Sequence, residues 1–243
     1  MGNVFAEITV KNAVDIALLK KGHITENNVR SVIAHDFAKK YGHDNYMRID
    51  NFDKTHPNVS VIAELVSILQ REIANQLKKK NPMIMHYIVT YGYVPPWVLV
   101  NIITFGTLSK FYSFLKQKDQ NDIGKHFNVI PRDMKVFLKN LALARNCCAH
   151  DERFFDMQLK SKIASNYFHS HLGLSGQQSR GKSDVFSLVI IIKHLLPKKA
   201  FNKFFNSLNK MITQLSNNLN TISINNVNDK MGFPTNWINI KSI

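Results

Sequence analysis

The sequence predicts an all-α protein, and three observations support this class. Apolar residues recur at spacings of three and four along several long segments, as they do on one face of an α-helix. No segment shows the alternation of apolar and polar residues that is typical of a series of β-strands. Pro95, Pro96, Pro131 and Pro197 stand at the ends or starts of these segments, where they interrupt no helix.

Two helices are predicted in the first half of the chain. Residues 58–80 form the first, with apolar residues such as Ile62, Leu65 and Leu69 on one face. Residues 92–96 form a turn, because Gly92 and the two adjacent prolines stop a helix. Residues 97–116 then form the second helix, in which apolar residues again recur at helical spacing.

The second half is predicted to contain three helices and an internal loop. One helix starts at Pro131 and carries an apolar stripe that runs from Met134 to Cys148. Residues 159–172 have weak periodicity, and residues 173–183 form a polar loop. Asp184 is a candidate N-cap for a helix over residues 185–196. The last helix covers residues 200–219, and its phenylalanines at positions 201, 204 and 205 are expected in the core.

Length and composition exclude several classes of protein. A chain of 243 residues with 44% hydrophobic residues can bury a sizeable core. We expect one domain over residues 1–243, and two small domains are the alternative. Its cysteines, Cys147 and Cys148, are adjacent, which excludes a disulfide framework and favours a reducing compartment. No signal peptide and no apolar run long enough to cross a membrane is found. We therefore expect a cytoplasmic protein.

The charge predicts an anionic partner. Lys and Arg number 32 and Asp and Glu 17, which gives a formal charge of +15. Such a charge attracts phosphates at long range. Nucleic acid is the favoured partner, and an anionic membrane surface or a merely Lys- and Asn-rich composition are the alternatives.

The segment around Arg145 and His150 has the greatest potential for chemistry. On a helix, Asn146, His150 and Arg153 share one face, which lies away from the apolar stripe. His titrates near neutrality and can move a proton from a 2′-OH or to a leaving oxygen. Arg matches phosphate oxygens and can stabilise a pentacovalent transition state. The alternative is structural, with both residues bonded to neighbouring carboxylates such as Asp151.

Several sequence blocks give this segment a context. Residues 145–153 (RNCCAHDER) resemble the signature of the Abi-like (abortive infection, AbiD/AbiF type) proteins, which are assigned to the HEPN superfamily of helical ribonucleases. Further blocks that resemble the family lie at residues 94–101 (VPPWVLVN), 104–112 (TFGTLSKFY), 183–186 (SDVF) and 231–237 (MGFPTNW). The likeness covers roughly residues 25–240.

The resemblance implies a HEPN-like helical bundle with additional flanking helices and a metal-independent endoribonuclease without cofactor. It implies catalytic roles for Arg145, His150 and Asn146, which match the Arg-x(4–6)-His motif and its neighbouring polar residue. Arg153, Lys110 and Lys139 are the expected RNA-binding residues. A homodimer is expected, because such enzymes often pair two motifs at a dimer interface. Family members usually begin with a further helical segment, and we expect this chain, which starts near Val4–Ile8, to lack it.

Two other motifs are open to a functional or a structural interpretation. Residues 30–36 (RSVIAHD) share the pattern Arg-x-x-x-Ala-His-Asp with residues 145–151, so Arg30 and His35 form a second motif or are part of an ordinary packed helix. Residues 176–183 (GQQSRGKS) fit the phosphate-loop pattern. An all-α chain lacks the sheet which that loop needs, so a polar loop is the expectation. Neither His169 with His171 nor the cysteines with His150 have the paired spacing of a zinc site, and no metal is expected.

These observations favour a ribonuclease of abortive-infection phage defence or of a toxin–antitoxin-like system. A non-catalytic RNA-binding protein, which forms a ribonucleoprotein with a small non-coding RNA, is the alternative. A helical interaction module with an incidental charge is the third possibility.

Overall fold

The computed structural model describes residues 24–55, 57–149, 157–177, 179–219 and 223–243. Within these residues every regular element is helical, and the β-pairing consists of one isolated bridge between Phe52 and Leu115. The predicted all-α class is therefore confirmed. The expectation that an N-terminal segment is lacking concerns positions outside the described residues.

Contacts divide the chain into two compact units, and helix α7 (Pro131–Ala149) runs through the boundary between them. The first is the Glu26–Leu138 unit. The second, the Lys139–Ile243 unit, also includes Ile24 and Thr25. The expectation of one domain stays a prediction.

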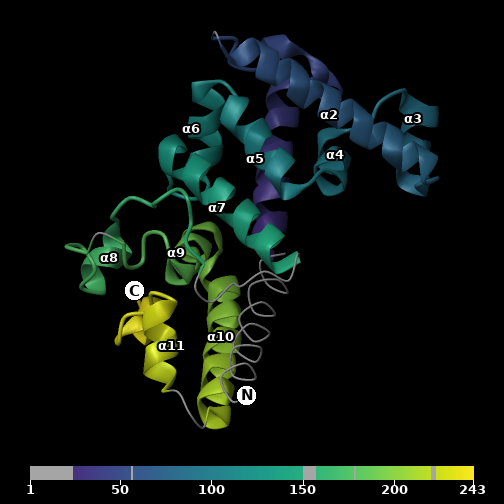
Figure 1. The fold of residues 1–243 in the computed structure, drawn as a ribbon. Helices are drawn as coiled ribbons and strands as arrows, with labels where there is room; N and C mark the ends of the chain where they lie inside the picture. Colours follow the sequence, from purple (N-terminus) through teal and green to yellow (C-terminus); the bar gives the residue numbers. More distant parts are fainter. Residues whose placement is uncertain (1–23, 56, 150–156, 178, 220–222) are drawn as a thin grey trace. The chain divides into compact units, whose positions relative to one another are not determined.

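The Glu26–Leu138 unit contains residues 26–41 of a helix over residues 24–41, drawn in purple in Figure 1, and the elements that follow it. These are η1 (Asn45–Met47), η2 (Ile49–Asn51), α2 (Asn58–Lys78), α3 (Pro82–Tyr91), α4 (Pro96–Ile102), α5 (Phe105–Phe114), α6 (Gln117–Lys125) and the first turns of α7. Helix α2 packs against α3, α4 and α5. Phe111 lies 5.2 Å from Phe37 and 5.3 Å from Phe52 between ring centroids, in edge-to-face arrangements that join the helix over residues 24–41 to α5.

The prediction of one continuous helix over residues 97–116 is wrong, because the structure contains two helices there, α4 and α5. Ile103 is extended, with ψ of 154°, and Thr104 caps α5 by accepting a hydrogen bond from the Thr107 backbone N–H. A Thr side chain that satisfies one of the free N–H groups stabilises a new helix start. Apolar spacing continues across this break, which is why periodicity alone predicts one helix.

The Lys139–Ile243 unit contains the rest of α7, α8 (Tyr167–His171), α9 (Val185–Leu195), α10 (Lys198–Asn218), α11 (Ile224–Lys230) and η3 (Trp237–Lys241). Helix α10 packs against α9, α11 and η3, and α10 and α11 are seen beside each other in Figure 1. The predicted helices over residues 185–196 and 200–219 correspond to α9 and α10. Phe201, Phe204 and Phe205 are buried, as expected for core residues.

Residues 157–166 contain no helix, and within the weakly periodic stretch 159–172 the chain is helical only over the five residues of α8. This stretch is held by backbone bonds to the segment before α9. The Leu159 N–H donates to the Ser183 carbonyl, and the Ile163 N–H donates to the Lys182 carbonyl. None of the helices in the described ranges is long and apolar enough to cross a membrane.

Candidate functional site

The C-terminal half of α7 presents a polar face. The side chains of Lys139, Arg145 and Asn146 are exposed, whereas those of Cys147 and Cys148 are buried. Lys139 and Asn146 are seven residues apart, about two helical turns, and therefore lie on the same side of the helix. The structure thus brings three of the predicted site residues onto one helix, with two of them in register and the apolar stripe behind them.

The buried side of α7 fixes this polar face in place. Asn140 is buried, and its side-chain amide donates a 2.8 Å hydrogen bond to the Ser161 carbonyl. A buried amide with a satisfied donor is stabilising, because an unpaired one costs about 1–3 kcal/mol. Asn140 therefore ties α7 to the segment that follows the motif in sequence.

Of the remaining predicted site residues, only Lys110 is among those that the structure describes. His150 and Arg153 are outside the described residues, so the predicted catalytic pair is not seen together. Lys110 is exposed on α5 and belongs to the Glu26–Leu138 unit. No group of three or more His, Cys, Asp or Glu side chains that could hold a metal ion is present in the described part of the chain.

The second Arg–His motif is divided between two roles. Arg30 is 7% exposed, and its Nη1 donates to the carbonyls of Val100 and of Ile103, the latter at 3.1 Å. Its guanidinium also lies over the Phe105 ring, 5.7 Å from the centroid. Because both carbonyls lie at the end of α4, where the helix leaves them without helical partners, Arg30 anchors the helix over residues 24–41 to the junction of α4 and α5.

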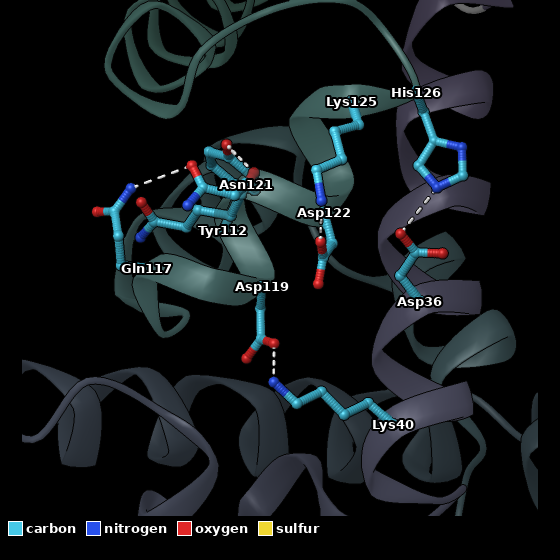
Figure 2. Close-up of polar contacts among 10 residues, drawn as sticks. Asp36, Lys40, Tyr112, Gln117, Asp119, Asn121, Asp122, Lys125 and His126 are labelled. Atoms are coloured by element: carbon cyan, nitrogen blue, oxygen red, sulfur yellow. Dashed lines mark hydrogen bonds and ion pairs between the residues drawn. The ribbon is translucent and has the colours of Figure 1, made fainter.

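His35, the other residue of that motif, points to a different neighbourhood. Its Nδ1 lies 3.0 Å from Oδ1 of Asp36, and Oδ2 of the same carboxylate lies 2.9 Å from Nε2 of His126. Figure 2 shows the contact between Asp36 and His126, which follows the end of α6. Two imidazoles that come from segments 90 residues apart therefore share one carboxylate.

These histidines line a cleft of about 630 Å³ between the helix over residues 24–41 and α6. Figure 2 shows that Lys40 bonds to the carboxylate of Asp119 and that Lys125 pairs with Asp122, the latter at 2.7 Å. The Tyr41 hydroxyl donates a further hydrogen bond to Asp119. Burial acts to lower the pKa of Lys40, but hydrogen bonds to Asp119 and Tyr41 outweigh it and the pKa is raised. Burial and the nearby Asp119 likewise raise the pKa of Tyr41.

Sequence reasoning missed this cleft. The adjacent pair His35-Asp36 is visible in the sequence, but its partner His126 follows α6, whose polar sequence gives no apolar stripe. Only the packing of the two segments shows that His126 joins His35 and Asp36.

The phosphate-loop pattern at residues 176–183 has a structural role. Asp184 caps α9, where its carboxylate accepts hydrogen bonds from the N–H groups of Gly181 at 2.7 Å and Ser187 at 3.0 Å. The Gly181 N–H lies within the pattern and would have to be free to cradle a phosphate. Since no strand precedes this loop in the described residues, the expected polar loop is what the structure contains.

The fold and the exposed polar face of α7 define a helical protein of positive charge, and its candidate site lies at one end of this long helix. The model of the family described as "Abi-like protein" matches residues 3–156, and the chain belongs to that family. Membership associates the protein with abortive infection, a form of phage defence. No curated protein and no solved structure matches the chain.

Proposed function

We propose that this Abi-like protein is a metal-independent endoribonuclease of the HEPN type, which acts in abortive infection or in a toxin–antitoxin-like system. The observation that carries the proposal is the exposure of Arg145 and Asn146 together at the C-terminal end of α7. Both side chains lie at the surface, beside two buried cysteines, and surface exposure is what contact with an RNA backbone requires.

The proposed chemistry uses the RNA's own 2′-OH as nucleophile. His150 accepts the 2′-OH proton as the 2′ oxygen bonds to phosphorus, and the bond from phosphorus to the 5′ oxygen breaks. A proton delivered to that oxygen leaves a 5′-OH end and a 2′,3′-cyclic phosphate. Arg145 stabilises the extra negative charge on the phosphoryl oxygens, and Asn146 orients the site. Lys139, Lys110 and Arg153 bind neighbouring phosphates.

A second candidate function rests on the charge of the whole chain. A formal charge of +15 on 243 residues supports RNA binding without requiring cleavage. In this alternative the protein holds a small non-coding RNA in a ribonucleoprotein. In either case we propose a homodimer, in which two Arg145–His150 motifs come together.

The two candidates are separated by one experiment. Purified wild type and the variants His150→Ala and Arg145→Ala are incubated with single-stranded RNA in EDTA, and the ends of the products are sequenced. The endoribonuclease produces 2′,3′-cyclic phosphate ends in wild type and none with His150→Ala. The exposed Lys54→Ala variant, which lies far from α7 in sequence, serves as the control and cleaves like wild type.

Undiminished cleavage by His150→Ala would overturn the catalytic assignment. RNA that co-purifies with both wild type and His150→Ala, without cleaved ends, would establish the binding protein instead. Sequencing that RNA also identifies the ligand.

A further inference from the structure

The cleft between the helix over residues 24–41 and α6 has a charge that depends on its two histidines. Its lining contains three lysines, Lys39, Lys40 and Lys125, and three aspartates, Asp36, Asp119 and Asp122. At neutral pH these six charges cancel. The net charge of the lining is therefore set by His35 and His126, from zero when both imidazoles are neutral to +2 when both are protonated.

The ion pairs inside the cleft involve two of its three lysines and not Lys39. Asp119 is bonded to Lys40 and Tyr41, and Asp122 to Lys125. Lys116, which lies over the Tyr41 ring at 5.5 Å, adds a further positive charge beside the lining. Lys39 is exposed and makes no ion pair with any described residue. An anion that enters the cleft therefore meets the ammonium group of Lys39 without breaking another pair.

The two imidazoles are held in fixed orientations with one nitrogen each to spare. Because a carboxylate only accepts hydrogen bonds, Nδ1 of His35 and Nε2 of His126 carry the protons that bond to Asp36. The second nitrogen of each ring has no hydrogen bond to the described residues, and the side chains are 68% and 47% exposed. When protonated, each ring offers a second N–H donor that a bound anion can accept.

We propose that this cleft binds a phosphate of a single-stranded RNA chain, with the protonated imidazoles of His35 and His126 and the ammonium of Lys39 as donors. The cleft volume lies within the range of about 300–1,000 Å³ typical of ligand sites, which leaves room for a nucleotide around the phosphate. The choice of RNA rests on the proposed function. The site is separate in sequence from the Arg145–His150 motif, and it positions RNA and performs no cleavage.

The test uses RNA that cannot be cleaved through its 2′-OH. A fluorescent 2′-O-methyl oligonucleotide of about 12 residues is titrated with the full chain at about pH 5.5 and about pH 8.5, at constant ionic strength. We expect wild type to bind at least about tenfold more tightly at the lower pH. The double variant His35→Asn, His126→Gln should lose most of this pH dependence, and Lys39→Ala should bind more weakly at both pH values.

The two histidine substitutions are chosen to preserve the fold. The Asn amide nitrogen replaces Nδ1 and the Gln amide nitrogen replaces Nε2, so each can still donate to Asp36, but neither takes up a proton. His86→Gln, on an exposed site of α3, controls for the general gain of positive charge at low pH, and Lys78→Ala controls for the loss of one lysine. Equal thermal unfolding temperatures of wild type and variants verify the fold. A double variant with the pH dependence of wild type would overturn the proposal.

Inorganic phosphate distinguishes the source of the anion. The ring proton resonances of His35 and His126 are followed by NMR while RNA or phosphate is added. Shifts that saturate at far lower concentrations of RNA than of phosphate support the RNA site. Shifts that saturate with phosphate but not with RNA overturn RNA as the ligand. Failure of this site and failure of the proposed function are distinguishable, because that function is tested by His150→Ala in a cleavage assay and this site by binding of uncleavable RNA.

Discussion

The carboxylate of Asp184 occupies the space that a side chain at Gly232 would need. A Cβ built on Gly232 overlaps Oδ2 of Asp184, and Gly232 has a φ of +81°, a conformation that residues with a side chain rarely adopt. The Phe186 N–H also donates to the Met231 carbonyl, next to this contact. Residues 183–186 and 231–237, which both resemble blocks of the family, thus meet at the N-terminus of α9, and this contact is structural.

Gly232→Ala should therefore strongly destabilise the Lys139–Ile243 unit. The substitution forces either the Asp184 cap or the backbone at position 232 to move, and we expect a loss of about 3 kcal/mol or more in the free energy of unfolding. Urea unfolding followed by circular dichroism measures it. Gly176→Ala is the matched control, since a Cβ there meets nothing within 4 Å, and it should change the stability by less than about 0.5 kcal/mol.

Arg30→Met should lower stability and not act on catalysis directly. The substitution keeps the apolar stem but leaves the carbonyls of Val100 and Ile103 without their donor, which costs about 1–3 kcal/mol. The measurement is the thermal midpoint together with RNA cleavage below that midpoint. If Arg30→Met kept the wild-type midpoint while cleavage was abolished, Arg30 would be catalytic. Arg132→Met, at an exposed arginine, is the control.

The stability of the Lys139–Ile243 unit should fall on acidification because of His169. This imidazole is fully buried; its Nε2 donates to the Gly181 carbonyl at 2.8 Å and its Nδ1 accepts from the Asn166 N–H at 3.2 Å. Burial lowers the pKa of His169 below its ordinary value of 6.5. The unfolded chain then binds the proton more tightly than the folded one, so this contribution is complete above about pH 6.5 and is lost as the pH falls below it.

The measurement is the thermal midpoint between about pH 7.5 and about pH 5, for wild type and His169→Gln. The variant should be less stable near neutral pH and should show a shallower decline on acidification. His171→Gln, at an exposed histidine two residues away, should keep the wild-type slope. Equal slopes in wild type and His169→Gln would contradict the assignment.

RNA binding should weaken with salt in proportion to the phosphates that lysines contact. For single-stranded nucleic acid, each contact contributes about 0.7 to the slope of log affinity against log salt concentration. Lys139→Ala and Lys110→Ala should each weaken binding and reduce the slope by about that amount. Lys54→Ala should leave the slope unchanged, since Lys54 already pairs with Asp50 at 2.7 Å. Slopes identical in all three variants would remove Lys139 and Lys110 from the interface.

Elements with strong local signals could be predicted from the sequence. Helices α2, α7 and α10 show apolar periodicity, and Asp184 is the N-cap of α9, as its position before an apolar run indicates. Thr104 is also a local signal for a helix start, because threonine is a favourable N-cap residue. The apolar spacing that continues across this position conceals the signal. Helix α6 carries mostly polar residues and gives no stripe from which it could be predicted.

The sites depend on contacts that no local pattern contains. The roles of Arg30 are decided by carbonyls about 70 positions away, and the cleft by the approach of His126 to Asp36. The resemblance to Abi-like proteins identifies Arg145 and Asn146 as candidates, and the structure adds that both are exposed. That His150 acts beside them stays a prediction.

Because α7 is continuous across the boundary of the two units, the protein cannot be dissected at that boundary without cost. A fragment that ends at Leu138 cuts the helix in the middle, and the cut removes the intrahelical bonds of about one turn on either side. Apolar residues such as Phe137 and Leu141 would then lie at frayed ends and promote aggregation. Shorter expression products should end outside residues 131–149, so that the helix carrying the candidate site stays whole.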